Sequence, residues 1–147
     1  MNPNCYAAHH GRGAVELRQG NYLEAIRAFD RAIQIEPNNP DGYNGRGLSL
    51  FMLERFSEAI NDFNRGIALD PAFSALYYGR GLVYFRLERY YEALFDFNKS
   101  LELNPDYKDA YQFRFYLYSV LAELTDDINL QSEYLEKAGI DLERWEQ

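Results

Sequence analysis

Few residues of this 147-residue sequence have types and spacings that suggest chemistry. Cys5 and His9 lie four positions apart, so on a helix they would share one face and could both ligate a metal ion. The sequence has one cysteine and two histidines, His9 and His10, and it offers no evident third ligand. A Ser/His/Asp or Cys/His set for nucleophilic catalysis is also lacking away from the N-terminus. The sequence therefore predicts no enzyme active site, no metal centre and no cofactor.

A second chemical candidate is the tripeptide Gly-Arg-Gly, which occurs at 11–13, 45–47 and 79–81. Glycines of this kind can cradle a phosphate when they form a turn before a helix, where backbone N–H groups are free. Arginine–glycine segments can also bind RNA, but such segments are disordered and basic. Whether either chemistry applies depends on the element that carries the tripeptide.

The sequence repeats itself at the constant spacing of these tripeptides, and such a period indicates stacked structural units. The segment YLEAIRAFDRAIQIEPN from Tyr22 matches FSEAINDFNRGIALDPA from Phe56 and YYEALFDFNKSLELNPD from Tyr90, without insertion. The coinciding positions are Ala25, Ala59 and Ala93, then Phe29, Phe63 and Phe97, and finally Pro37, Pro71 and Pro105. The repeats are 6–39, 40–73 and 74–107, followed by a partial fourth repeat and a cap over 108–147.

Each repeat is predicted to hold two helices, because apolar residues recur at steps of three and four and a proline closes each second helix. Gly-Arg-Gly then falls in the middle of the first helix, where the N–H groups are already bonded, so neither a phosphate loop nor a disordered RNA-binding segment fits. The predicted first helices are 5–18, 41–53, 75–87 and 108–124, and the predicted second helices are 22–36, 56–70 and 90–103.

The period, the recurring aromatic, Gly, Ala and Phe positions and the closing proline resemble the tetratricopeptide repeat family over residues 6–107. The family usually has leucine where this chain has Arg12, Arg46, Arg80 and Arg114, and the sequence is closer to a variant that carries Asn-Arg-Gly there. Phe115 replaces the expected glycine of a fourth repeat, so the array is ending. The resemblance implies an all-α fold, a right-handed α-solenoid of helix–turn–helix repeats with a C-terminal capping helix, forming a single domain over 1–147.

The glycines need an explanation, because each costs about 0.5–1 kcal/mol inside a helix relative to alanine. The second glycines, Gly13, Gly47 and Gly81, lie on the face that presses against the second helix, which predicts close helix packing. For the first glycines two interpretations stay open: close packing between successive first helices, or bare backbone at the floor of a groove. These first glycines are Gly11, Gly45 and Gly79.

The arginines of the tripeptide lie on the side of the buried face, and a buried guanidinium needs partners. Asp62 and Asp96 are the candidates. The sequence leaves two pairings open, one within a repeat (Arg46–Asp62, Arg80–Asp96) and one to the next repeat (Asp62–Arg80, Asp96–Arg114).

The resemblance also implies a concave groove lined by the inner positions of the first helices. Some family members bind acidic chaperone tails through a basic clamp there, but this surface has no lysine, so that activity is not carried over. An apolar helix or extended peptide is the expected ligand. The predicted groove residues are His10, Asn44, Leu48, Phe51, Tyr78, Leu82, Phe85, Gln112 and Tyr116.

The segment 123–147 differs from the rest of the chain, because it holds 8 acidic and 2 basic side chains, a net charge of −6. It is predicted to form a helix with Thr125 or Asp126 as its cap, which Gly139 could break in two. A solenoid end needs a solubilising cover, so we expect this segment to cap the last repeat, with insertion into the groove or exchange with a neighbour as alternatives.

The net charge of −8 excludes a general nucleic-acid binder and an anionic membrane surface as partners. No apolar run approaches the roughly 18–20 residues of a membrane span, and no signal peptide is evident, so a cytoplasmic location is expected. The sequence therefore predicts a non-catalytic scaffold that binds a protein or peptide. The alternative is a self-associating scaffold that forms homo-oligomers.

Overall fold

Helices form where the three-to-four periodicity predicts them, and each end of the first seven helices lies at the predicted position or at the one next to it. The structure, a computed structural model, describes residues 4–147, and this part of the chain contains helices and no strand. The helices are α1 (Tyr6–Arg18), α2 (Tyr22–Ile35), α3 (Pro40–Met52), α4 (Phe56–Leu69), α5 (Ser74–Arg86), α6 (Tyr90–Leu103), α7 (Lys108–Leu124) and α8 (Ile128–Glu146).

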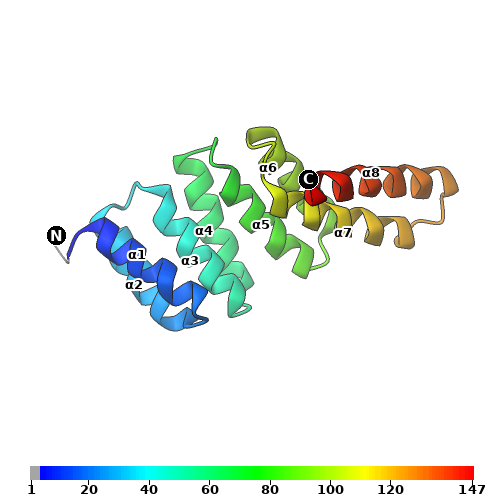
Figure 1. The fold of residues 1–147 in the computed structure, drawn as a ribbon. Coiled ribbons are helices and arrows are strands. Elements are labelled where there is room, and N and C mark those ends of the chain that lie inside the picture. The colour runs from blue at the N-terminus through cyan, green and yellow to red at the C-terminus, as the bar shows by residue number, and fades with distance from the viewer. Residues whose placement is uncertain (1–3) are drawn as a thin grey trace.

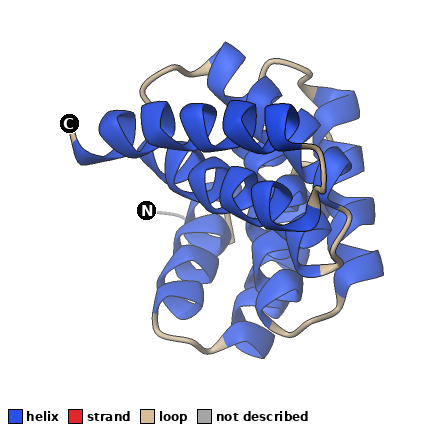
Figure 2. Ribbon diagram, turned by 90° about the vertical axis from the view of Figure 1, so that its right-hand side faces the viewer, coloured by secondary structure: helices blue, strands red, loops and turns tan. Residues whose placement is uncertain are grey.

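Consecutive helices pair as hairpins, and the hairpins stack along one direction (Figure 1). The α1–α2 hairpin lies at one end of the stack and the α7–α8 hairpin at the other (Figure 1). Figure 2, which views the array from one end, shows the helices in layers joined by short loops. This is the α-solenoid of helix–turn–helix repeats that the sequence predicts.

The turns repeat with the same period as the helices. The second helix of each of the first three repeats ends before its proline. In the first of these turns, the Tyr43 hydroxyl donates a hydrogen bond of 2.8 Å to the carbonyl of Pro37. Inside each of the first three hairpins, one residue turns the chain with a left-handed backbone: Gly20 at φ 81°, Glu54 at 59° and Glu88 at 58°. Glycine adopts this conformation without strain, whereas the two glutamates carry a steric cost for it.

The glycines of the tripeptide make room for one buried phenylalanine per repeat. A Cβ at Gly47 would lie 2.9 Å from the ring of Phe63, in the second helix of the same repeat. A Cβ at Gly79, in the following repeat, would overlap that same ring. Phe63 is fully buried between the two backbones. The second glycines thus pack the hairpin, as predicted.

The first glycines are explained differently from either interpretation offered by the sequence. Gly45 and Gly79 receive Phe29 and Phe63 of the preceding second helix, so they neither pack a neighbouring first helix nor leave bare backbone in a groove. Gly11 is the exception, because a Cβ there would meet nothing within 4 Å. The same glycine therefore has a packing role in the inner repeats and none in α1.

The acidic C-terminal segment forms one continuous helix, α8, and Gly139 does not break it. Its cap is Asp127, whose carboxylate accepts hydrogen bonds from the N–H groups of Asn129 (2.9 Å) and Leu130 (3.2 Å), and not Thr125 or Asp126 as predicted. α8 lies against α7, at the end of the stack rather than in the groove (Figure 1). The buried residues that join the two helices include Leu117, Tyr118, Leu121, Ala122, Tyr134 and Ala138.

Candidate functional site

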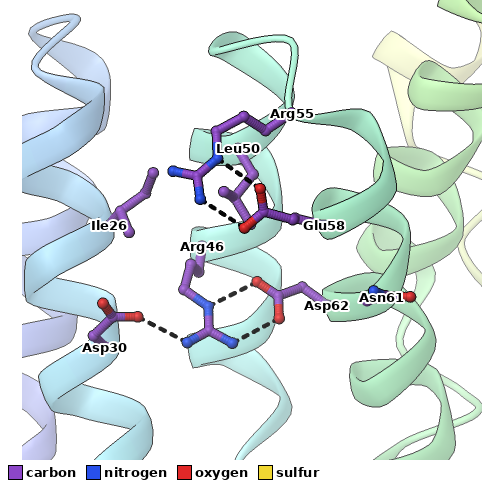
Figure 3. A pocket seen from close by; sticks show the side chains of 8 residues that line it. All are labelled: Ile26, Asp30, Arg46, Leu50, Arg55, Glu58, Asn61 and Asp62. Atoms are coloured by element: carbon purple, nitrogen blue, oxygen red, sulfur yellow. Dashed lines mark hydrogen bonds and ion pairs between the residues drawn. The ribbon is translucent and has the colours of Figure 1, made fainter.

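An arginine bracket fastens each pair of neighbouring repeats. Arg46 Nε and Nη2 donate to the two carboxylate oxygens of Asp62 at 2.8 and 2.7 Å, across the same hairpin. Its Nη1 donates to Asp30 of the preceding repeat at 2.7 Å (Figure 3). One guanidinium in α3 thereby holds α2 and α4 together. The planar fork of arginine suits this bidentate geometry.

The next bracket has this same geometry in the following repeat. Arg80 Nε and Nη2 donate to the Asp96 carboxylate, both at 2.8 Å, and Nη1 donates to Asn64 at 2.7 Å. Of the two pairings that the sequence left open, the structure has the one within a repeat. The contact to the preceding repeat uses Asp30 and Asn64, which the sequence analysis did not identify.

The third bracket joins the cap to the array. Arg114 donates to both carboxylate oxygens of Asp141 at 2.7 and 2.6 Å, and Nη1 donates to Asn98 at 2.8 Å. Asp141 lies 27 residues after its arginine, compared with 16 in the inner repeats. Its signal in the sequence is Ala-x-x-Asp at 138–141, which copies the same pattern at 59–62 and 93–96 but follows its arginine after a longer connection.

The electrostatics of the brackets are those of structural ion pairs. The hydrogen bonds that Arg46 donates to the Asp62 carboxylate raise the pKa of Arg46, and those that Arg80 donates to Asp96 raise the pKa of Arg80. Burial raises the pKa of Asp96, and the charge and hydrogen bonds of Arg80 oppose that effect. The Asp96 side chain is 1 % exposed and the Arg80 side chain 17 %, so the pair exposes no reactive carboxylate to a ligand.

A cleft of about 360 Å³ opens between α2 and α4, above Arg46 (Figure 3). Its charged groups are already paired with one another, since Arg55 donates to Glu58 at 2.6 Å and Arg46 holds Asp30 and Asp62. The cleft therefore offers a ligand no unpaired charge, and we regard it as part of the repeat interface. Its lining consists of Ile26, Asp30, Arg46, Leu50, Arg55, Glu58, Asn61 and Asp62.

The predicted groove residues are unequally accessible. Tyr116 is 42 % exposed, while Leu82 is 7 % exposed and belongs to the hydrophobic core, so Leu82 presents little surface to a ligand. The Phe51 ring contacts the Phe56 ring at 6.1 Å, and the Arg86 guanidinium lies over both rings and pairs with Glu54. The half-buried positions are His10, Asn44, Leu48, Phe51, Tyr78, Phe85 and Gln112.

Three of the predicted groove residues meet around a fourth aromatic that sequence reasoning missed. Phe113 contacts Tyr78, Phe85 and Tyr116 with ring centroids 6.0, 6.4 and 6.3 Å apart. Phe113 stands where Gly45 and Gly79 stand in the inner repeats, and this substitution was its signal in the sequence. We call Tyr78, Phe85, Phe113 and Tyr116 the aromatic cluster. It joins α5 to α7.

The aromatic cluster extends to one further, half-buried tyrosine. The Tyr78 and Tyr107 rings are 4.8 Å apart. Burial raises the pKa of Tyr107 to about 12, and it also raises the pKa of Tyr78. Both hydroxyls thus stay neutral near pH 7, and the cluster presents apolar ring surface rather than charge.

Two other features of the described residues bear on function. Residues 4–147 contain no group of three or more His, Cys, Asp or Glu side chains placed to hold a metal ion, so the Cys5–His9 pair has no further ligand there. Among the helices of this same range, none has the length and hydropathy to cross a membrane.

Comparison with solved structures shows the same fold in several proteins. MamA superposes with a TM-score of 0.78 at 23 % identity, covering 97 % of this chain and 81 % of that one. The Arabidopsis OM64 TPR domain gives 0.74 at 25 % identity, covering 80 % and 97 %. The first TPR of Spaghetti (RPAP3), bound to the HSP90 peptide SRMEEVD, gives 0.66 at 24 % identity and covers 97 % of both chains.

Family models identify the repeats directly from the sequence. A search of curated proteins finds no significant match. The family model described as Tetratricopeptide repeat matches residues 74–107, and the one described as TPR repeat matches residues 13–54 and 49–88. Together they span three repeats, and the chain therefore belongs to the tetratricopeptide repeat family.

Proposed function

We propose that residues 1–147 act as one non-catalytic binding domain, a scaffold that holds an apolar segment of another protein on the inner surface of the repeats. The aromatic cluster carries the proposal, because it gathers rings from two repeats at positions that the family uses as its groove. Exposed aromatic surface is typical of interaction sites. The first TPR of RPAP3, which has the same fold, is seen with a bound peptide, and this supports the class of function.

The chemistry of the surface favours an apolar ligand over an acidic one. The groove positions carry no lysine, and the neighbouring Arg86 is already paired with Glu54. An acidic peptide would be repelled by a protein of net charge −8. An apolar helix or strand would instead cover ring surface on Tyr116, Phe85 and Phe113. We include His10, Asn44, Leu48, Phe51 and Gln112 in the binding surface, and we place the protein in the cytoplasm, where its lone cysteine would stay reduced.

The test is affinity capture with a matched pair of variants. Tyr116→Arg places a charge at the exposed side of the aromatic cluster, whereas Tyr91→Arg makes the same change on α6, at a tyrosine that is 67 % exposed outside the cluster. Partners that use the cluster should be lost with Tyr116→Arg and retained with Tyr91→Arg. Retention of every partner by Tyr116→Arg would refute binding at this surface.

Self-association is the second candidate function, and the uncovered face of α1 favours it. In the inner repeats the equivalent face is filled by the preceding second helix. Sedimentation equilibrium over a range of concentrations separates the two candidates, since a scaffold for other proteins alone stays monomeric.

A further inference from the structure

The contact between successive repeats has two complementary halves. The receiving half, on a first helix, is a glycine followed by an arginine, as at Gly45 and Arg46. The inserting half, on the preceding second helix, is a phenylalanine followed by an acid or amide, as at Phe29 and Asp30. The Phe29 ring fits against Gly45, and Arg46 donates a hydrogen bond of 2.7 Å to the carboxylate of Asp30. The next interface uses Phe63 and Asn64 with Gly79 and Arg80 in the same way.

At the N-terminal end, α1 carries the receiving half, and none of the described residues 4–147 fills it. A Cβ at Gly11 would meet no atom within 4 Å. The Arg12 side chain is 64 % exposed, and its ion pair with Glu16 of the same helix is long, at 3.9 Å. Val15 beside them is 43 % exposed, whereas its equivalent in α3, Ser49, is fully buried.

At the C-terminal end, α8 carries the inserting half. Ala138 and Asp141 are buried in α8 as Ala93 and Asp96 are in α6, and Asp141 takes the same bidentate hydrogen bonds from its arginine. This register places Leu142 where the inner repeats have phenylalanine. It places Glu143, which is exposed, where they have Asp30, Asn64 and Asn98.

We propose that a second copy of this chain docks its α1 on α8, head to tail, with Leu142 against Gly11 and Glu143 paired with Arg12. Charge supports the contact: residues 123–147 carry a net −6, whereas residues 1–35 carry 4 basic and 3 acidic residues, a net +1. Such a contact is heterologous and leaves a free end on each copy, so it builds open chains rather than closed dimers.

The contact is weaker than the interfaces inside the chain. Gly139 and Glu146 replace the apolar residues that inner second helices present, such as Ile26 and Ile33, and Glu16 replaces Leu50 on the receiving side. Less apolar surface is buried, so the Arg12–Glu143 ion pair contributes a larger share of the attraction. Association is therefore concentration dependent, and added salt weakens it.

Sedimentation equilibrium of the full chain tests the proposal, at low salt and rising concentration. The weight-average mass should climb past that of a dimer. Gly11→Phe places a ring in the receiving site, where a Cβ would meet no atom within 4 Å. Arg12→Glu and Glu143→Arg each place like charges opposite one another, and each should raise the dissociation constant at least about tenfold. Arg27→Glu is the control for Arg12→Glu, because it changes the net charge by the same amount at an exposed site of α2.

The double variant Arg12→Glu/Glu143→Arg restores opposite charges and should restore association. A mass that stays monomeric at all concentrations would overturn the proposal. So would association that survives Gly11→Phe, an equal loss in Arg27→Glu, or a double variant that fails to associate. Because the contact uses the ends of the solenoid, Tyr116→Arg should leave it intact. If head-to-tail docking is refuted, the proposal that the groove binds a peptide is unaffected.

Discussion

At the scale of single residues, we expect opposite effects on stability from adding a methyl group at two glycines that both begin a Gly-Arg-Gly tripeptide. Gly79→Ala places a methyl group into the Phe63 ring, and such overpacking costs typically about 1–3 kcal/mol. Gly11→Ala meets open space in the same kind of helix and should stabilise the protein by about 0.5–1 kcal/mol, since alanine loses less backbone entropy. Urea unfolding measures both changes through the midpoint at constant slope.

Gly139 supplies the control for this pair. It also meets no atom within 4 Å and lies in the interior of α8, so Gly139→Ala should behave like Gly11→Ala. A Gly79→Ala protein as stable as the original would show that Phe63 does not fill the space between the repeats.

The left-handed turn residues give a second prediction at this scale. Glu88 has φ 58°, where its Cβ costs about 1–2 kcal/mol, and the equivalent position in the first repeat is Gly20. Glu88→Gly should therefore raise the melting temperature, although the more flexible unfolded chain offsets part of the gain. Glu88→Ala keeps the Cβ and removes only the carboxylate, so it should change little. Equal effects of the two substitutions would mean that the charge, and not the backbone, sets the cost.

At the scale of helices, the arginine brackets decide how hairpins and repeats are held. Asp96→Ala removes the carboxylate that takes two hydrogen bonds from Arg80, and breaking a buried pair in this way costs about 3–5 kcal/mol. Glu92→Ala is the matched control, because it removes a carboxylate that is paired with Arg89 near the start of the same helix but is exposed. Calorimetry should show a large loss for the first change and a loss below about 1 kcal/mol for the second.

The same scale shows what a sequence can and cannot predict. Helix bounds were predictable because period, apolar face and closing proline agree three times. Position 30 was overlooked because its contact runs to the next repeat, and only the third dimension brings Asp30 to Arg46. Asp141 was overlooked because the longer helices of the α7–α8 hairpin shift its register relative to Arg114. Phe113 gave a visible signal, the loss of glycine, but not the rings that would surround it.

At the scale of the whole molecule, each repeat is stabilised by its contacts with the neighbouring repeats, so a repeat at either end of the array lacks one of these contacts. The two ends differ here. The C-terminal end is covered by α8, with its own bracket and with Tyr134 stacked on Tyr118 at 6.0 Å. The N-terminal end leaves Gly11 and Arg12 uncovered. One end of the solenoid is therefore covered by an acidic helix, whereas at the other end no residue within 4–147 packs against Gly11.

Deleting residues 126–147 tests what the closed end contributes. The deletion exposes Leu117, Leu121 and Tyr118 of α7 and leaves Arg114 without Asp141, so the shortened chain should be less stable and should associate through apolar surface. This association would persist at high salt and in the Gly11→Phe background, which separates it from head-to-tail docking. Light scattering after gel filtration, with thermal unfolding alongside, measures both effects. A truncated protein that is monomeric and equally stable would show that α8 does not act as a cap.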